Sequence, residues 1–363
     1  MRIIFDASVF DYELSGIAKS TLCLYEACKE KDPLFLAFGL TYKIDGKPKT
    51  SAIQWIDLNK NNNKDIEELI LHNNIEFIHY PNNAINNVEN YGLKEIATIN
   101  DILPLQIPGY FYQGFGVKKI LGLIIGKWRK YKYIINMKKR ISQLSIILTI
   151  SQFSKKSIES VFNPVCLVKT IPLGNTFGEH AVNMDKDNYI IYWGGYHSRK
   201  GLNYLVDAFC KYRNNENTDL KLLIVGKKYS LTQECDLKII SAVKEGIIQE
   251  LGYLNDNELI KYAKKAKGLF YLSSYEGFGL PIIEAMSLGC PVVTTNRTSC
   301  GEIAGDAAIF VEPENIGQVY NAIQKIDYNY EVRKKLIEKG LIQAKKYNWD
   351  DAASIFLNVL GGK

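Results

Sequence analysis

The chain has 363 residues, of which 47% are hydrophobic and 23% charged, and its formal net charge is +6. This length predicts two domains, each with its own core, and the composition is that of an ordinary globular protein. No apolar run approaches the roughly 18 residues that a membrane-spanning helix requires, so none is predicted. The seven cysteines include no C-x-x-C pair, which favours reduced thiols in a cytosolic protein over a disulfide framework.

The first predicted unit is a strand, a loop and a helix. The strand covers residues 2–7, a polar loop runs over 8–15, and Gly16 precedes a helical pattern that extends to Cys28. A glycine between a strand and a helix can form a phosphate cradle, because the first amides of the helix are not used inside it. A lone glycine there is more often part of a turn, so both interpretations stand.

Strands alternate with helices through the rest of the first half. The pattern predicts strands at 34–38, 75–80, 96–99, 145–150 and 167–171, and helices at 66–71 and 151–162. Asn100 and Asp101 directly follow one of these strands. Such alternation is typical of a parallel sheet with helices packed on it, so the predicted fold class is α/β.

Residues 102–158 carry eleven Lys or Arg and no Asp or Glu, with aromatic residues interleaved between 110 and 133. One interpretation is a solvated helix face with an aromatic side toward the core. Another is a surface at 110–140 that lies on an anionic membrane, with its aromatic rings among the headgroups. A nucleic-acid-binding patch would have the same charge pattern and is the least favoured of the three.

A polar stretch at 172–188 is predicted to link two domains, and residues 189–193 begin the second as a buried strand. Arg199 and Lys200 follow in a glycine-lined loop, directly before an amphipathic helix that begins at Leu202. Two cations beside the amides of a helix start suit a diphosphate leaving group. An Arg-Lys pair is usually surface charge, but this setting favours a functional role.

The second half continues to alternate. We predict strands at 220–226, near Ile247, at 268–272, 291–295 and 307–311, and late helices at 316–326, at 332–346 and from Trp349 onward. The second half is therefore expected to form another parallel sheet.

The stretch from Ser273 to Val293 places two carboxylates in a strand, loop, helix, strand unit. Glu276 lies in the loop, and Glu284 is expected in the first turn of a helix that Pro281 begins. Glycines in the loop let the backbone approach a ligand, and helix amides can hold an anion. The combination suits a nucleotide sugar, with diphosphate on amides and ribose hydroxyls on carboxylate. A lone glutamate is more often a solvated residue or a partner of the helix dipole.

Seven residues separate Glu276 from Glu284 within EGFGLPIIEAMSLGCPVV. This stretch resembles the E-x7-E motif of family 4 of the retaining glycosyltransferases, which have the GT-B fold. The resemblance covers most of the chain and is weakest at 40–95 and 105–140, where we expect the acceptor site to be shaped. It implies two doubly wound, Rossmann-like parallel-sheet domains that face a cleft.

The resemblance implies a role for each matching residue. Arg199 and Lys200 match a phosphate-binding G-x-x-x-R-K-G/N stretch, and with Glu276, which would grip the donor sugar, they are the predicted catalytic residues. Glu284 would hold the ribose. The other predicted donor contacts are Gly16, Phe278, Gly279 and Leu280.

Two positions depart from the family pattern. Asn100 stands where the family usually has a histidine near the reacting sugar. Asn100 and Asp101 can contact the sugar or the acceptor, but the Asn100 amide cannot carry a proton as a histidine can. Gly195 stands where many relatives have an arginine, which leaves one cation fewer near the phosphates.

We predict an acceptor-side domain at 1–172, a nucleotide-sugar donor domain at 189–345, and a C-terminal helix at 346–363 that crosses back to the first domain. The implied activity is retaining transfer of a hexose, from GDP-mannose or next from a UDP-sugar, to a glycan or lipid-linked glycan in cell-surface polysaccharide synthesis. No metal, other cofactor or nucleic acid is expected. The expected location is cytoplasmic, peripheral at the inner face of the membrane.

Two alternatives remain open. A GT-B binding subunit without activity is favoured only by Asn100. A sugar-nucleotide epimerase of the same fold would not need the E-x7-E stretch, which favours transfer.

Overall fold

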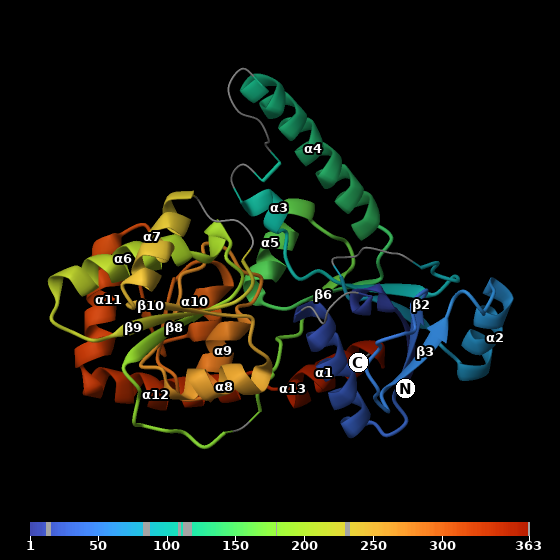
Figure 1. Cartoon of the computed structure of the whole chain (residues 1–363). Coiled ribbons are helices and arrows are strands. Elements are labelled where there is room, and N and C mark those ends of the chain that lie inside the picture. Colours follow the sequence, from blue (N-terminus) through green and yellow to red (C-terminus); the bar gives the residue numbers. More distant parts are fainter. Residues whose placement is uncertain are drawn as a thin grey trace. The chain divides into compact units, whose positions relative to one another are not determined.

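The computed structural model describes residues 1–11, 16–82, 88–107, 110–111, 118–178, 180–228 and 233–361 (Figure 1). The predicted loop at 12–15 and the aromatic residues between 112 and 117 lie outside the described residues. The chain divides into two compact units, Met1–Gly174 with Asn348–Lys363, and Asn175–Tyr347. The stretch 175–188, predicted as a linker, therefore belongs to the second unit.

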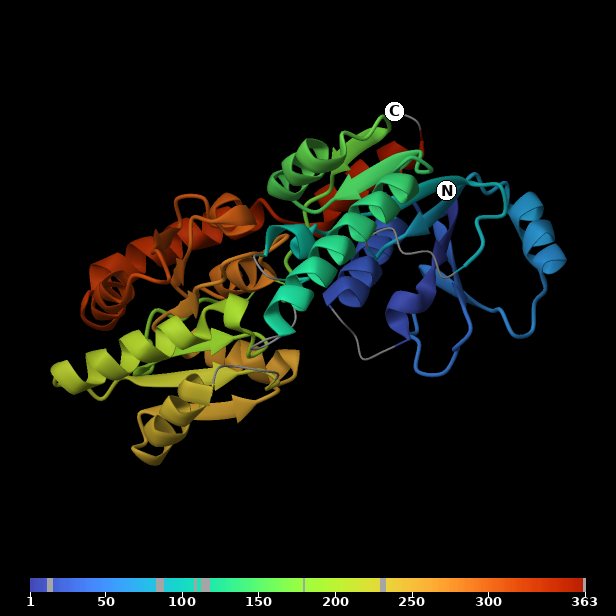
Figure 2. The ribbon, with the colours of Figure 1, turned by 90° about the horizontal axis from the view of Figure 1, so that it is seen from above.

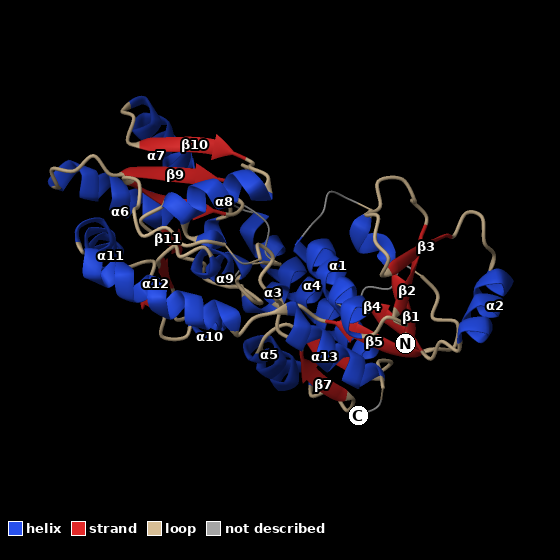
Figure 3. Cartoon of the chain, turned by 90° about the horizontal axis from the view of Figure 1, so that it is seen from below, coloured by secondary structure: helices blue, strands red, loops and turns tan. Residues whose placement is uncertain are grey.

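The first unit is built on a seven-stranded parallel sheet with the order β3-β2-β1-β4-β5-β6-β7 (Figure 3). Its strands are β1 (Arg2–Asp6), β2 (Leu36–Thr41), β3 (Ile53–Asp57), β4 (Phe77–Tyr80), β5 (Lys94–Thr98), β6 (Ile146–Thr149) and β7 (Leu167–Thr170). Strand β3 was not predicted from the sequence, because it is an edge strand in which only Ile53 and Ile56 are buried.

Helices cover both faces of this sheet. They are α1 (Gly16–Lys31), α2 (Asn63–Asn73), α3 (Leu103–Gln106), α4 (Lys118–Ile141), α5 (Gln152–Phe162) and α13 (Trp349–Leu360), with a 3-10 turn η1 (Ala7–Phe10). Alternate residues of β1 point to opposite faces, as strand geometry requires. Ile3 and Phe5 pack with α1 and α13, whereas Ile4 packs with α2 and α5. The last helix of the chain thus completes one core of the first unit.

Helix α4 is 24 residues long and runs as a single straight helix (Figure 2). Most of its side chains from Leu123 to Lys139 are exposed, and Tyr133, Ile134 and Met137 are half-buried on its inner side. Among the described residues, no helix combines the length and apolar character needed to cross a membrane.

The second unit holds a six-stranded parallel sheet with the order β10-β9-β8-β11-β12-β13. Its strands are β8 (Tyr189–Trp193), β9 (Lys221–Val225), β10 (Ile248–Gly252), β11 (Leu269–Tyr271), β12 (Val292–Thr294) and β13 (Ala308–Phe310). Its helices are α6 (Leu202–Asn215), α7 (Gln233–Lys244), α8 (Asp256–Lys265), α9 (Leu280–Ser287), α10 (Thr298–Ala304), α11 (Ile316–Tyr328) and α12 (Tyr330–Lys345), with a 3-10 turn η2 (Ser198–Lys200). Helix α7 was not predicted from the sequence.

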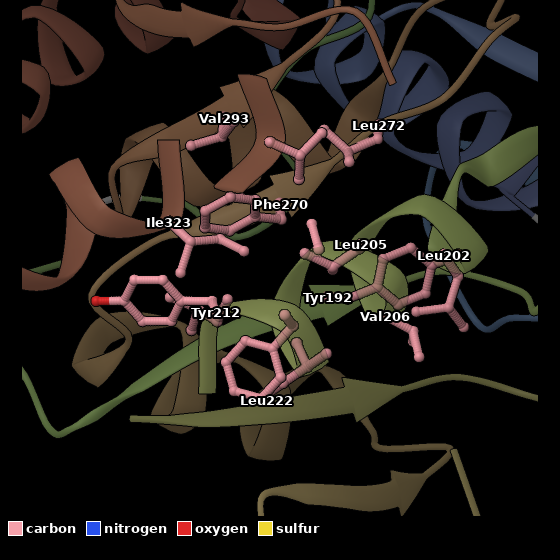
Figure 4. Close-up of a cluster of buried hydrophobic side chains, with 14 of the residues drawn as sticks. Tyr192, Leu202, Leu205, Val206, Tyr212, Leu222, Phe270, Leu272, Val293 and Ile323 are labelled. Carbon is pink, nitrogen blue, oxygen red and sulfur yellow. The ribbon is translucent and has the colours of Figure 1, made fainter. Parts of the chain in front are cut away.

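Apolar strands of this sheet pack against α6 and α11. Figure 4 shows Tyr192 of β8 and Phe270 of β11 with Leu205 of α6 and Ile323 of α11 in one buried cluster. Strands buried in this way read as continuous apolar runs, which is why the sequence predicted them. The predicted α/β class, with a doubly wound parallel sheet in each unit, is confirmed.

The strand order reverses between β8 and β11. The chain runs from β8 outward to β9 and β10, and then returns to β11 on the other side of β8. In open α/β sheets, ligands bind beyond the carboxyl ends of the strands at such a reversal. We therefore expect a ligand site in the loops that follow β8 and β11.

Candidate active site

The turn after β8 places two cations at the carboxyl end of the second sheet. Arg199 and Lys200 lie in η2, and Gly201 with a φ of 72° connects this turn to α6. A Cβ at Gly201 would lie 2.2 Å from the carbonyl oxygen of Leu272. Only glycine permits this approach, which brings both cations against the end of β11.

One carboxylate oxygen, Oε1 of Glu276, joins these cations to β11. Lys200 Nζ lies 2.6 Å from this oxygen and Arg199 Nη1 lies 2.9 Å from it. Tyr271, the last residue of β11, donates its hydroxyl to the same oxygen at 2.8 Å, and Ser273 Oγ donates at 2.7 Å. The three predicted catalytic residues thus meet at one atom.

The protein leaves part of the hydrogen-bonding capacity of this cluster unused. Within the described part of the chain, every donor to the Glu276 carboxylate goes to Oε1, and none to Oε2. Lys200 donates one N–H to Glu276 and one to the Tyr271 hydroxyl, each at 2.6 Å. One of the three N–H groups of its ammonium therefore remains unused. Arg199 uses Nη1, on Glu276 and on the carbonyl oxygen of Tyr275. One acceptor and several charged donors remain for a ligand.

Charge, not burial, decides the protonation of Glu276. Burial alone would raise the pKa of Glu276, but the charges of Lys200 and Arg199, with hydrogen bonds from Lys200 and Ser273, outweigh it and lower the pKa to about 2. Burial raises the pKa of the Tyr271 phenol, and the Glu276 charge adds to this effect. Near neutral pH, Glu276 is therefore an anion and Tyr271 a neutral hydrogen-bond donor.

The start of α10 fixes the backbone of Glu276. The Glu276 N–H donates to Thr298 Oγ1 at 3.2 Å, and its carbonyl oxygen accepts from Ser299 Oγ at 2.8 Å. Tyr271 and Ser273 were not predicted from the sequence as partners of Glu276. The spacing Tyr-x-Ser-x-x-Glu at the end of a strand is the signal that could have indicated them.

Helix α9 carries the second glutamate of the motif. Glu284 lies in the second turn, not in the first as predicted, because α9 begins at Leu280, one residue before Pro281. The Glu284 side chain is largely buried, and Thr176 Oγ1 donates to its Oε1 at 2.6 Å. Gly279, with a φ of 107°, precedes the helix and offers no side-chain cap. The first amides of α9 therefore lack a side-chain partner from the capping position.

Two predicted donor contacts differ in how they can act. Phe278 is buried, and its ring lies edge-on to Tyr347 with the ring centroids 5.6 Å apart. Its side chain therefore supports the loop, and a ligand contact there would use the backbone. Leu280 is half-buried at the start of α9.

The remaining predicted residues belong to the first unit. Gly16 begins α1, and a Cβ there would meet no described atom within 4 Å, so packing does not require glycine at this position. Asp101 Oδ1 accepts from the Leu103 amide at 2.9 Å. Asn100 lines a small cavity at the carboxyl ends of the strands, and its carbonyl oxygen accepts from Ser154 Oγ at 2.8 Å.

The same cavity is lined by His79, which the sequence analysis did not single out. The Tyr25 hydroxyl bonds to His79 Nδ1 at 2.6 Å, and Thr98 Oγ1 bonds to Nε2 at 2.8 Å. Burial lowers the pKa of His79 to about 3. The ring is therefore neutral near pH 7 with both nitrogens used, and it supports the cavity wall without carrying a proton.

The architecture defines the class of protein: this is the GT-B fold of glycosyltransferases. The solved structure of sucrose-phosphate synthase from Thermosynechococcus elongatus is similar over 100% of this chain and 99% of its own, with a TM-score of 0.74 and 15% sequence identity. At that identity the likeness establishes the fold alone.

Sequence comparison then adds similarity to named proteins. Residues 178–342, which lie within the second unit, match the family model described as glycosyl transferases group 1. The chain is similar to O-antigen chain mannosyltransferase B of Escherichia coli, with 29% identity over 231 residues, which are 60% of this chain and 61% of that protein. It is also similar to O-antigen chain mannosyltransferase RfbU of Salmonella typhimurium, with 23% identity over 268 residues, which are 69% of this chain and 70% of that protein.

The chain thus spans about three fifths of the length of the Escherichia coli relative. The predicted resemblance to GT-B glycosyltransferases and to polysaccharide mannosyltransferases is confirmed.

Proposed function

We propose that this protein is a hexosyltransferase that moves a hexose from a nucleotide sugar to a glycan or lipid-linked glycan in cell-surface polysaccharide synthesis. The observation that carries the proposal is the meeting of Arg199, Lys200 and Glu276 at one oxygen atom, beside the strand-order reversal. Cations there suit the donor diphosphate, and the second oxygen of Glu276 suits a sugar hydroxyl. GDP-mannose is the favoured donor because both relatives are named mannosyltransferases, and UDP-sugars come next.

The proposed reaction retains the configuration of the sugar by a front-face route. The bond between the anomeric carbon and the phosphate oxygen breaks, and its electron pair stays on the diphosphate. The acceptor oxygen bonds to the anomeric carbon from the same face, and the acceptor proton passes to the departing phosphate oxygen. The unused N–H groups of Arg199 and Lys200 stabilise the charge that develops on the leaving group.

Other residues would bind the donor. Oε2 of Glu276 would accept a hexose hydroxyl, and Glu284 would accept hydroxyls of the ribose. At the start of α9, Pro281 has no N–H and the Ile282 N–H donates to the Gly279 carbonyl oxygen at 2.9 Å. The Leu280 amide would therefore be the helix-start donor to phosphate. Gly16 in the first unit would let the backbone approach the diphosphate, while Asn100 and Asp101 would contact sugar or acceptor.

Transfer is proposed to need no metal ion, since two side-chain cations already serve the diphosphate. In the residues that the structure describes, no group of three or more His, Cys, Asp or Glu could hold one. Addition of EDTA is expected to leave turnover unchanged. A loss of turnover that Mg²⁺ or Mn²⁺ restores would contradict this part of the proposal.

Thermal unfolding with GDP, UDP or dTDP tests the donor site directly. A nucleotide at a hundredfold excess over its Kd should stabilise the folded protein by about 2.7 kcal/mol. We expect one of the three to raise the Tm of the wild type with or without EDTA, and Glu284→Ala to lose most of that rise. The absence of any rise in the wild type, with no donor hydrolysed, would favour a GT-B binding subunit without activity.

We also propose that α4 contacts an anionic membrane. Ile124, Trp128, Tyr131 and Ile135 follow each other at helical spacing on one face, which we call the α4 stripe, and each is between 45% and 64% exposed. Basic residues flank the α4 stripe on both sides: Lys127, Lys132, Lys138 and Lys139. An apolar stripe bordered by lysines suits a helix that lies among anionic headgroups, where a lipid-linked acceptor would be found.

Co-sedimentation with lipid vesicles tests this contact. The wild type should bind phosphatidylglycerol vesicles and not phosphatidylcholine vesicles. The double variant Lys127→Glu/Lys138→Glu should bind at least about tenfold more weakly, since each basic residue contributes about 1 kcal/mol. The control Lys334→Glu/Lys335→Glu makes the same charge change on exposed positions of α12 and should bind like the wild type. Equal weakening by both variants would assign the binding to net charge alone.

A further inference from the structure

Tyr271 bridges the two oppositely charged side chains at the centre of the site. Its hydroxyl accepts from Lys200 Nζ at 2.6 Å and donates to Glu276 Oε1 at 2.8 Å. The ring is fully buried at the end of β11, and Lys200 Nζ also lies 5.0 Å from the ring centroid. The bridge is therefore anchored in the sheet, whereas its partners come from the 3-10 turn η2 and from the loop after β11.

This anchor matters because a donor diphosphate competes with Glu276 for Lys200. The lysine ammonium is a point charge on a flexible four-carbon chain, so its position depends on what holds it. With Glu276 as its only partner, an incoming phosphate would draw the ammonium away from the carboxylate and release both. A hydroxyl fixed in β11 keeps the ammonium beside the carboxylate while the third N–H of Lys200 turns to the ligand.

We propose that Tyr271 is a positioning residue for the glycosyl transfer. Its hydroxyl fixes Lys200 Nζ and Glu276 Oε1, and the unused N–H of Lys200 and Oε2 of Glu276 are thereby directed to the donor. This inference rests on the proposed function, because it concerns the same cluster. Burial, which raises the pKa of Tyr271, keeps its hydroxyl protonated and able to donate.

The same unit contains a matched control. The Tyr212 hydroxyl donates to Asp327 Oδ2 at 2.8 Å, and Lys267 Nζ donates to Asp327 Oδ1 at 2.6 Å. Tyr212 is as completely buried as Tyr271. Tyr212→Phe therefore removes the same group from the same kind of partner, a carboxylate paired with lysine, at the opposite end of the sheet.

The experiment compares Tyr271→Phe with Tyr212→Phe in kcat, donor KM and Tm, with rates normalised to folded protein. Loss of a hydrogen bond to a charged group should lower the kcat of Tyr271→Phe about 10- to 100-fold. The donor KM should change little, because the lost interaction aligns Lys200 with charge that develops during transfer. Tyr212→Phe should lower Tm and leave kcat unchanged. Equal kcat values for the two variants would overturn the proposal.

A double-mutant cycle separates positioning from mere support of the fold. If Tyr271 acts through Lys200, Tyr271→Phe should cost little further kcat in a Lys200→Met background. Additive effects of Tyr271→Phe and Lys200→Met on kcat would contradict the proposal. Tyr212→Phe in the same background provides the reference for independent sites.

Failure of the positioning role and failure of the proposed function give different results. A wild type that turns over no nucleotide sugar contradicts the proposed function, and the role of Tyr271 is then measured by the Tm rise that GDP or UDP produces. Free GDP or UDP carries on its terminal phosphate the negative charge that develops on the leaving group during transfer, and the donor sugar nucleotide does not. Tyr271→Phe should therefore reduce the Tm rise produced by GDP or UDP even though the donor KM changes little, and Tyr212→Phe should keep that rise. Equal rises in the two variants would overturn the positioning role alone, and no rise in the wild type would overturn both.

Discussion

Strand β11 has a tyrosine, a carboxylate and a lysine at each of its ends. At the amino end, Lys267 and Tyr212 bond to Asp327, and we call these three residues the closed triad. At the carboxyl end, Lys200 and Tyr271 bond to Glu276, and we call these the open triad. The two sets have the same chemical groups at similar distances, yet they differ in what they leave unused.

In the closed triad, both carboxylate oxygens have donors from the protein. Oδ1 of Asp327 accepts from Lys267, and Oδ2 accepts from Tyr212 and from Thr218 Oγ1 at 2.8 Å. Lys267 also bonds to Asn188 Oδ1 at 2.6 Å. The Asp327 side chain is 2% exposed. A carboxylate enclosed in this way stabilises the contact between α6, α11 and the start of β11.

In the open triad, all the donors bond to one oxygen, Oε1 of Glu276, and they include a second cation. Arg199 joins Lys200 on Oε1 of Glu276, and its side chain is 27% exposed. The triad also lies at the carboxyl end of the sheet, where the glycines at 201 and 279 shape the loops. A buried Tyr–carboxylate–Lys set is therefore not in itself a site. The open triad is a candidate site because it has unused hydrogen-bond donors and acceptors and lies at the strand-order reversal.

The largest contrast is expected when each carboxylate becomes an amide. Glu276→Gln should lower turnover about 10³-fold, because it disturbs both cations that stabilise the leaving group. Asp327→Asn should lower the free energy of unfolding by about 3–5 kcal/mol, because it breaks a buried ion pair, and should leave kcat unchanged. Steady-state kinetics and urea unfolding of both variants measure the two effects. A loss of kcat in Asp327→Asn would remove the distinction.

Lys200 and Lys267 should differ in the same way, with loss of kcat at Lys200 and loss of stability at Lys267. The effect on kcat should be smaller than that of Glu276→Gln. Lys200→Met should lower kcat about 10²-fold, since it removes one charge from the leaving-group side. Lys267→Met should leave kcat unchanged and destabilise the protein, because Asp327 stays buried without its cation. Comparable kcat in the two variants, measured with saturating donor, would argue against a role for Lys200 in transfer.

Acid should weaken the fold through both carboxylates. The pKa of Glu276 is lowered to about 2, below its unfolded value of about 4.3, so its stabilising contribution is present above that unfolded value and is lost as pH falls toward 2. The pKa of Asp327 is also lowered, since hydrogen bonds from Lys267, Thr218 and Tyr212 outweigh burial. The difference in unfolding free energy between wild type and Glu276→Gln should therefore shrink as pH falls from about 4.3 toward about 2. A constant difference across that range would contradict the lowered pKa of Glu276.

The hydroxyl donors should give the smallest effects. Ser273→Ala removes one of four donors to Glu276 Oε1 and should lower kcat by up to about tenfold, in line with a net hydrogen-bond contribution of about 1 kcal/mol. Thr218→Val removes one donor from Asp327 and should lower the free energy of unfolding by about 1 kcal/mol with kcat unchanged. A kcat effect of Thr218→Val equal to that of Ser273→Ala would contradict the division between the triads.

Sequence patterns predicted the parts of the site that local chemistry determines. The apolar run before Ser273, the glycines of the loop and the Arg199-Lys200 pair before a helix each follow from neighbouring residues. Parallel sheets in both units followed from the alternation of strands and helices, and β8 was predicted at its observed bounds. Among the side chains of the missed helix α7 whose burial is described, those of Cys235, Ile239 and Ala242 are buried, so its apolar pattern is short.

The partners of Glu276 could not be predicted, because they depend on tertiary packing. Tyr271 belongs to an apolar strand and looks like a core residue until its hydroxyl is seen to reach Glu276. In the closed triad, Lys267 is 60 positions and Tyr212 is 115 positions away from Asp327 in the sequence. No local sequence pattern links residues so far apart. The prediction that Glu284 lies in the first turn of its helix was wrong, because α9 begins one residue earlier than predicted, at Leu280.

The role of the open triad in transfer is tested by the release of nucleoside diphosphate from GDP-mannose and from UDP-glucose. The release is measured for the wild type, Glu276→Gln and Asp327→Asn. The assay is made at a temperature at which all three are folded. We expect release by the wild type and by Asp327→Asn at equal rates per folded molecule, and almost none by Glu276→Gln. Equal rates for the wild type and Glu276→Gln would contradict the assignment of the open triad as the catalytic site.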